Sequence, residues 1–275
     1  MIPSCNLHTH TVFCDGANTV DEMVKAAIEA GLSTIGFSGH LFVKIDPEQD
    51  WCMKEKDRLQ YCVDIKKAKE QYKDKINILL GYEKDYFSPM PDDDYDYSIG
   101  SVHFVCKEGV YVPMDLEPDQ LFEAVKQLYS GDFLAMAKEY YRLVADVRRK
   151  TGGEIVGHFD LLTKFNEKYN FIDTENKEYR NAALEAADAL LEDKELVFEI
   201  NTGAMSRGWR STPYPADFII RHIANKNGRL IITGDSHSAK SIVYGYDDAV
   251  EYARSCGVKE LWTVKSGKEF TPVKI

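Results

Sequence analysis

The sequence predicts an α/β fold of seven or eight βα units, most simply a single barrel. Short apolar runs rich in β-branched residues alternate with longer amphipathic stretches along the chain. Histidines and carboxylates recur just after several of these runs, where parallel barrel strands deliver their carboxyl ends to one face. A chain of 275 residues with 44% hydrophobic content can bury one large core, so we expect one domain over residues 1–275.

The predicted strands are short, and most have the uninterrupted apolar character of buried parallel strands. They cover residues 5–8, 34–38, 76–82, 97–103, 154–158, 196–201, 230–233 and 260–264. Helices are predicted over 19–30, 54–73, 119–150 with a break near Gly131, 177–192, 215–227 and 246–255. The first helix has the clearest signals, because Asn18 or Thr19 can cap its start and Gly31 can end it.

Two long loops, 41–53 and 84–96, each follow a predicted strand. On a barrel such loops lie on the active-site face, which favours contacts with a substrate. The second loop carries the acidic run 92–94, for which a solvated surface loop is an equally good interpretation.

Composition narrows the class of partner. A net charge of -11 disfavours a broad surface for polyanions, so we expect a small substrate and no nucleic acid.

No secretory signal precedes the first histidine motif, and no apolar run approaches the ~20 residues of a membrane helix, so we expect a cytoplasmic protein without membrane contact. The six cysteines lack CxxC pairs, which argues against a disulfide framework or a thiolate zinc site. The oligomeric state is not indicated.

Two pairs of candidate ligands lie near the ends of the chain. His8 and His10 end the first predicted strand, and a spacing of two residues in extended backbone points both imidazoles to the same side. Taken alone, this pair is as compatible with hydrogen bonding at a barrel rim as with metal binding. Asp235 and His237 repeat the same spacing after the run 230–233. A carboxylate and an imidazole without nearby thiolates favour an open hydrolytic metal site.

Four further candidates, His40, Glu83, His103 and His158, also follow predicted strands. Of seven histidines, six therefore occupy strand ends, and only His222 falls inside a predicted helix. A structural role explains any one of them, but not all six together with two carboxylates. The pattern predicts a multinuclear metal centre. Asp15 lies in an Asp-Gly loop that leaves the first strand, where it can form a turn or serve as another ligand.

At these positions the sequence resembles the PHP (polymerase and histidinol phosphatase) family, and within it the histidinol-phosphate phosphatase branch. The resemblance covers nearly the whole chain. Its motifs are His8-Thr9-His10, Cys14-Asp15-Gly16, Gly36-Phe37-Ser38-Gly39-His40, Gly81-Tyr82-Glu83, Gly100-Ser101-Val102-His103-Phe104, Gly157-His158-Phe159-Asp160-Leu161, Glu199-Ile200-Asn201-Thr202 and Gly234-Asp235-Ser236-His237. Gly39 departs from the family, which usually has an acidic residue at this position.

The resemblance implies a distorted (β/α)7 TIM-like barrel with three divalent ions of zinc, iron or manganese. One ion would be held by His8, His10, Glu83 and Asp235, with Glu83 bridging to a second ion. The second ion would also be held by His103 and His158. The third would be held by Asp15, His40 and His237.

The function implied is hydrolysis of L-histidinol phosphate to L-histidinol and phosphate, a step of histidine biosynthesis. We hypothesise that bridging metals generate hydroxide for in-line attack on phosphorus. The catalytic residues would be Glu83, Asp235, His237 and Asp160. The leaving group would be protonated by metal-bound water or by Asp160, which can also orient a ligand or cap the segment that follows it.

Arg207 resembles the family's phosphate-contacting arginine, and its forked donors suit a phosphate dianion. Lys164 and Arg210 are further candidates for substrate binding, although loop cations are often merely solvated.

Two alternative functions remain open from the sequence. One is a PHP phosphoesterase that acts on nucleotides, oligonucleotides or another small phosphate ester. The other is a non-catalytic metal-binding regulatory protein that keeps the barrel.

Overall fold

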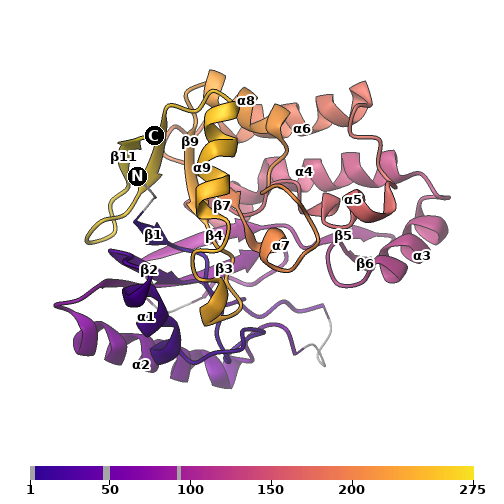
Figure 1. Ribbon diagram of the computed structural model, residues 1–275. Helices are drawn as coiled ribbons and strands as arrows, with labels where there is room; N and C mark the ends of the chain where they lie inside the picture. Colours follow the sequence, from indigo (N-terminus) through magenta and orange to yellow (C-terminus); the bar gives the residue numbers. More distant parts are fainter. Residues whose placement is uncertain (1–3, 46–49, 92–93) are drawn as a thin grey trace.

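The protein forms a nearly closed barrel of parallel strands surrounded by helices, as Figure 1 shows. The computed structural model describes residues 4–45, 50–91 and 94–275. Seven strands lie in the order β1-β2-β3-β4-β7-β8-β9, and every neighbouring pair is parallel. Their bounds are β1 Cys5–Asn6, β2 Thr34–Phe37, β3 Asn77–Asp85, β4 Tyr97–Ser101, β7 Ile155–Val156, β8 Val197–Asn201 and β9 Arg229–Thr233.

The first and last strands of the barrel meet just beyond their carboxyl ends. Thr9 and Ser236 form an isolated parallel bridge. Within it, the His10 amide donates to the Ser236 carbonyl at 2.9 Å, and the Ser236 amide donates to the His8 carbonyl at 3.0 Å. The two histidine motifs therefore close the barrel, and the predicted distorted (β/α)7 barrel is confirmed.

Nine α-helices lie among the described residues, most of them packed around the strands (Figure 1). Thr19 and Glu22 form a capping box at the start of α1, and the predicted break near Gly131 separates α3 from α4. The helix bounds are α1 Val20–Glu29, α2 Glu55–Tyr72, α3 Pro118–Leu128, α4 Phe133–Thr151, α5 Asn166–Tyr169, α6 Lys177–Leu190, α7 Gly203–Ser206, α8 Asp217–Asn225 and α9 Tyr246–Ser255. Among the described residues, no helix combines the length and apolar character needed to cross a membrane.

Two hairpins depart from the predicted series of βα units. The predicted strand 260–264 forms β10 (Glu260–Thr263), but it pairs antiparallel with β11 (Thr271–Lys274) and adds no eighth barrel strand. The predicted strand 97–103 ends at Ser101 in β4. Beyond His103 the chain forms a hairpin of β5 (Phe104–Lys107) and β6 (Val110–Pro113), which we did not predict.

The interior of the barrel has an apolar layer near the amino ends of the strands. Leu7, Leu79, Ile99 and Ile231 belong to this layer, together with the ring of Tyr97. The Tyr97 hydroxyl donates to the Leu7 carbonyl, so the ring lies across the barrel interior. Above this layer, toward the carboxyl ends, the inward side chains become polar. The apolar layer therefore lies directly beneath the polar cluster inside the barrel.

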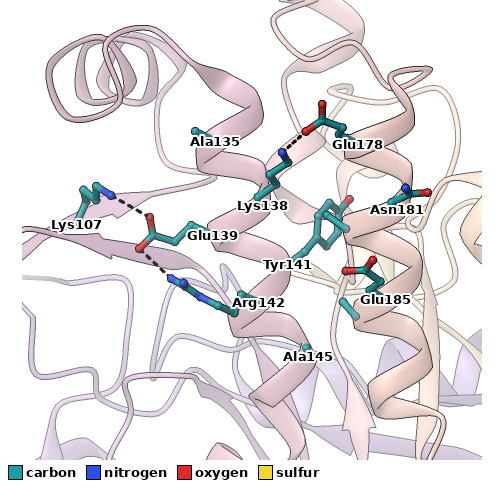
Figure 2. A pocket seen from close by; sticks show the side chains of 12 residues that line it. Lys107, Ala135, Lys138, Glu139, Tyr141, Arg142, Ala145, Glu178, Asn181 and Glu185 are labelled. Carbon is teal, nitrogen blue, oxygen red and sulfur yellow. Dashed lines mark hydrogen bonds and ion pairs between the residues drawn. The ribbon is translucent and has the colours of Figure 1, made fainter.

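The helices α4 and α6 pack side by side outside the barrel, and side chains from both of them line a groove (Figure 2). The volume of this groove is about 710 Å³. Lys138 of α4 pairs with Glu178 of α6 across this groove, and Glu139 pairs with Lys107 and Arg142. None of the predicted site residues lines it. The groove is accordingly not the place where the predicted chemistry would occur.

Tyr97 depends on small residues in the two neighbouring strands. A Cβ added to Gly81 would lie 2.5 Å from Cε1 of Tyr97, and one added to Gly36 would lie 2.5 Å from its hydroxyl oxygen. We predict that Gly81→Ala lowers the free energy of unfolding by about 1–3 kcal/mol, since the ring has no room to move within the barrel. Urea unfolding monitored by circular dichroism measures this loss.

The double variant Gly81→Ala/Tyr97→Leu separates this clash from a general effect of alanine in the strand. Relief of the clash predicts a loss of stability smaller than the sum of the two single losses. Strict additivity of the two losses would contradict the packing explanation.

Candidate metal centre

Glu83, at the carboxyl end of β3, is a buried carboxylate with four imidazoles within 3.3 Å and a fifth, that of His10, at 3.6 Å. Its Oε2 lies 3.0 Å from Nε2 of His8 and 3.0 Å from Nδ1 of His40. Its Oε1 lies 2.9 Å from Nε2 of His158 and 3.3 Å from Nε2 of His103. The four histidines follow β1, β2, β4 and β7, so Glu83 joins four neighbouring parts of the barrel.

A second group of ligands lies beside Glu83 on the side of β1 and β9. The His10 Nε2 atom lies 3.3 Å from Oδ1 of Asp235, and the His237 Nε2 atom lies 3.1 Å from Oδ2 of Asp15. The rings of His10 and His237 stack with centroids 4.1 Å apart. His40 contacts both groups, because its Nε2 is 3.7 Å from Oδ2 of Asp15.

The structure brings all nine predicted ligands together in four overlapping clusters. Within each cluster one potential ligand atom per residue lies within 4.8 Å of the others. The clusters are His10/Asp15/His40/His237, His8/His10/Asp235, His8/Glu83/His158 and His40/Glu83/His103. His103 and His158 thus fall in different clusters, each with Glu83, whereas the family resemblance groups them on one ion. The assignment of ligands to particular ions stays a prediction.

The chemistry of this donor set fits divalent metal ions. Burial opposes ionisation of Glu83, yet the imidazoles of His8, His40 and His103 outweigh it and hold the pKa of this carboxyl well below its usual value. Burial, together with the neighbouring imidazoles of His237 and His40, lowers the pKa of His10 to about 3, so its imidazole is neutral at neutral pH. Ionised carboxylates and neutral imidazole nitrogens are the ligands that zinc, iron and manganese take in proteins.

Outside the nine residues, two further carboxylates orient the ligand histidines. Glu199 of β8 lies with Oε1 2.6 Å from Nδ1 of His8, and its Oε2 accepts a hydrogen bond from the His158 amide at 2.9 Å. Asp85 of β3 accepts from the His103 amide at 2.8 Å and lies 3.2 Å from Nδ1 of the same residue. Carboxylates in this position fix the tautomer and the orientation of a ligand imidazole.

The sequence contained a signal for both of these carboxylates. Asp85 is two residues after Glu83, so an extended strand directs both side chains to one face. Glu199 opens a motif of the family resemblance, but we assigned it no role.

Asp235 reaches the cluster through an unusual backbone conformation. Its φ of 43° lies in the left-handed region, which aspartate tolerates better than most residues with a side chain. A Cβ added to Gly203 would lie 2.5 Å from Oδ2 of Asp235, so the absence of a side chain there makes room for the carboxylate. Arg207 donates to the same oxygen at 3.2 Å, and its Nη1 lies 2.9 Å from Nδ1 of His237.

A cavity of about 220 Å³ opens over the cluster on the carboxyl-end face. Two of the predicted substrate-binding residues, Lys164 and Arg207, line it. So do Asp115, Leu116 and Leu161, which sequence reasoning did not select. The cavity therefore places cationic side chains beside the predicted metal ligands.

One long predicted loop also reaches this face. Trp51, in the loop 41–53, has its ring centroid 5.2 Å from that of His40 and 6.0 Å from that of His103. In the loop 84–96, the acidic residues Asp92 and Asp93 lie outside the described residues.

Asp160 and Arg210 do not line the cavity over the cluster. They line a separate cavity of about 380 Å³, where Oδ2 of Asp160 accepts from the Ala216 amide at 3.0 Å. Arg210 donates to the Thr163 hydroxyl and the Thr212 carbonyl. Their catalytic and substrate-binding roles stay predictions. His222, the seventh histidine, is partly buried on α8 with Nε2 2.6 Å from Oδ1 of Asp188, apart from the cluster.

A parallel barrel that gathers histidines and carboxylates at the carboxyl ends of its strands defines a class of metal-dependent hydrolases. Within that class, this chain belongs to the PHP domain family, whose family model matches residues 6–203. The matched region ends before Arg207, Asp235 and His237. In the structure these three residues nevertheless line the same cavity as ligands from the matched region.

The chain is similar over most of its length to curated proteins with a common name. A Deinococcus radiodurans protein named "Probable histidinol-phosphatase" is 28% identical over 266 residues, which cover 92% of this chain and 94% of the relative. The "Histidinol-phosphatase" of Bacillus subtilis is 24% identical, with 89% and 97% covered.

A solved structure has the same fold. It is the histidinol phosphate phosphatase of Lactococcus lactis, complexed with zinc, L-histidinol and phosphate. It is 21% identical, covers 98% of this chain and 100% of its own, and superimposes with a TM-score of 0.75.

The buried contact between Glu199 and His8 generates a prediction about metal affinity. Glu199→Gln keeps the shape of the side chain but removes the charge that orients the His8 imidazole. We expect zinc affinity to fall by about 10–100-fold, the usual effect of losing an outer-shell partner. Competition with a chromophoric chelator measures this affinity. As a matched control, Glu192→Gln removes a charge at an exposed position and should leave the affinity unchanged. Equal affinity in both variants would contradict the role given to Glu199.

Proposed function

We propose that this protein is a metal-dependent phosphomonoesterase that hydrolyses L-histidinol phosphate to L-histidinol and phosphate in histidine biosynthesis. The observation that carries the proposal is the convergence of nine residues with nitrogen or oxygen ligand atoms, Glu83 among them, beneath a cavity with two cationic side chains. Membership of the PHP domain family and the shared name of the relatives support the choice of reaction and of substrate.

The cationic side chains are suited to bind the phosphate. The guanidinium of Arg207 is held beside Asp235 and His237, so its position is fixed relative to the ligand cluster. Burial opposes the charge of Arg207, but the Asp235 carboxylate outweighs it and raises the pKa of the guanidinium. Lys164 adds a second positive charge, with its Nζ donating to the Asp115 carbonyl at 2.6 Å. Together they would offset the charge of a phosphate dianion.

The metal complement is part of the proposal. We propose three divalent ions of zinc, iron or manganese, held by His8, His10, Asp15, His40, Glu83, His103, His158, Asp235 and His237. When bound, such ions would supply Lewis-acid activation of water and of the phosphate. Glu83 would keep its ligand histidines together, while Glu199 and Asp85 would orient them.

A phosphate-release assay on purified protein of known metal content tests the proposed function. The substrates are L-histidinol phosphate, nucleoside monophosphates, sugar phosphates and short oligonucleotides. We expect L-histidinol phosphate to have the highest kcat/KM. Efficient turnover of another substrate with no turnover of L-histidinol phosphate would refute the substrate assignment, and no turnover of any would favour a non-catalytic protein.

The same assay tests the central ligand. Glu83→Ala removes the carboxylate that four imidazoles share, so we expect loss of bound metal and a fall in phosphate release beyond the ~100-fold typical of an outer-shell partner. Glu139→Ala is the matched control, because it removes a largely buried carboxylate that is ion-paired with Lys107 outside the barrel. Full activity of Glu83→Ala would contradict the proposed metal centre, whatever its metal content.

A further inference from the structure

One histidine beside Glu83 differs from the others in what its second ring nitrogen contacts. His8 and His103 place Nδ1 against a carboxylate, Glu199 at 2.6 Å and Asp85 at 3.2 Å. His158 also directs Nε2 toward Glu83, at 2.9 Å, but its Nδ1 has no hydrogen-bond partner among the described residues. A neutral imidazole that offers Nε2 to an ion carries its proton on Nδ1. This N–H is buried, since the His158 side chain is only 3% exposed, and a buried donor without an acceptor is unfavourable.

Two more polar atoms without a partner belong to the surroundings of His158. They are the Tyr214 hydroxyl and Oδ1 of Asp160, both buried and without a hydrogen bond in the described part of the chain. The ring centroids of His158 and Tyr214 lie 6.3 Å apart, with the planes at 67°. Asp160 follows His158 by two residues, and its Oδ2 accepts from the amide of Ala216, two residues after Tyr214. The segments that carry the three atoms are thus held together by a hydrogen bond.

The three atoms are also complementary in hydrogen bonding. Burial raises the pKa of the Tyr214 hydroxyl, and the Asp160 carboxylate raises it further against the opposing charge of Arg210. The hydroxyl is therefore protonated and can donate, as Nδ1 of His158 can, whereas Oδ1 of Asp160 can only accept when ionised. Buried polar groups without a protein partner are usually paired with ordered water. A buried water molecule typically makes about three hydrogen bonds to such groups.

We propose that Tyr214 and Asp160 are positioning residues that orient the His158 imidazole through one shared, buried water molecule. The water accepts from Nδ1 of His158 and from the Tyr214 hydroxyl, and it donates to Oδ1 of Asp160. It takes the place of the direct carboxylate contacts that orient His8 and His103. The inference rests on the proposed function, because it concerns a ligand of the proposed metal centre. In this role Asp160 acts on a ligand and not on the leaving group.

A crystal structure of the zinc-loaded protein tests the shared water directly. We expect an ordered water molecule within about 3.2 Å of Nδ1 of His158, of the Tyr214 hydroxyl and of Oδ1 of Asp160. A structure in which these three atoms share no water would overturn the proposal.

Zinc affinity, measured by competition with a chromophoric chelator, tests the effect on the ligand. Tyr214→Phe removes the hydroxyl and keeps the ring, so we expect a fall of about 10-fold, the lower end of the usual loss for an outer-shell partner. Tyr179→Phe is the matched control, because it removes a buried hydroxyl that pairs with Tyr141 at 2.8 Å between α4 and α6. It should leave the affinity unchanged. Equal affinities in the two variants would overturn the role given to Tyr214.

A double variant shows whether the two residues act through the same water. Asp160→Asn replaces one carboxylate oxygen by an amide nitrogen and should also weaken zinc binding. In Tyr214→Phe/Asp160→Asn the loss of affinity should be smaller than the product of the two single losses, since either change alone already disrupts the shared water. Single losses that simply multiply would show two independent effects and would contradict the shared water.

A spectroscopic measurement separates this role from general packing. In zinc-loaded protein with isotope-labelled histidine, Tyr214→Phe and Asp160→Asn should each shift the magnetic resonance signal of the Nδ1–H proton of His158, whereas Tyr179→Phe should not. An unshifted signal in Tyr214→Phe would overturn the proposal. Failure of the unaltered protein to bind zinc would instead refute the proposed metal centre, and this inference with it.

Discussion

The structure depends on one buried carboxylate that four imidazoles share. Both oxygens of Glu83 lie within 3.3 Å of imidazole nitrogens that follow four other strands of the barrel. Taking a carboxylate out of water is unfavourable unless opposite charges and hydrogen bonds replace the solvent. Here the histidines supply that environment, and the Ser101 hydroxyl donates a further hydrogen bond to Oε1 at 2.6 Å. The arrangement requires a fold in which several strands end at the same place.

A parallel barrel meets this requirement through its layers. Apolar side chains and the Tyr97 ring fill the interior near the amino ends of the strands, and Gly36 and Gly81 leave room for that ring. The polar side chains lie nearer the carboxyl ends of the strands. At this level the bridge between Thr9 and Ser236 closes the barrel. Around the ligands, Glu199 and Asp85 fix the imidazoles, so that the site is supported from the strands and not only from the loops. The substrate side is then formed by loops and by the hairpin that carries Asp115.

The barrel and the convergence of the ligands could be predicted from the sequence because both follow from local pattern. A short apolar run followed by a histidine needs no knowledge of distant contacts, and parallel strands bring their carboxyl ends to one face. The predicted break near Gly131 likewise separated α3 from α4, with Ser130 and Gly131 both at positive φ.

Features that depend on pairing between distant segments could not be predicted in this way. The run 260–264 has the composition of a barrel strand, but β10 pairs with β11 instead of joining a barrel that β1 and β9 already close. The orientation of Asp160 also depends on a distant segment, since its carboxylate accepts from Ala216. Asp115 was not selected from the sequence because the hairpin that places it beside the ligands was not predicted. The residues Glu108-Gly109 between β5 and β6 are nevertheless a recognisable turn signal.

The most direct test of this account is anomalous diffraction from crystals of the protein grown with zinc, at energies on both sides of the zinc absorption edge. The central role of Glu83 predicts ions within bonding distance of both of its carboxylate oxygens, about 2.0–2.2 Å for zinc and oxygen. Ions bound only by surface residues, with no anomalous peak beside Glu83, would contradict it.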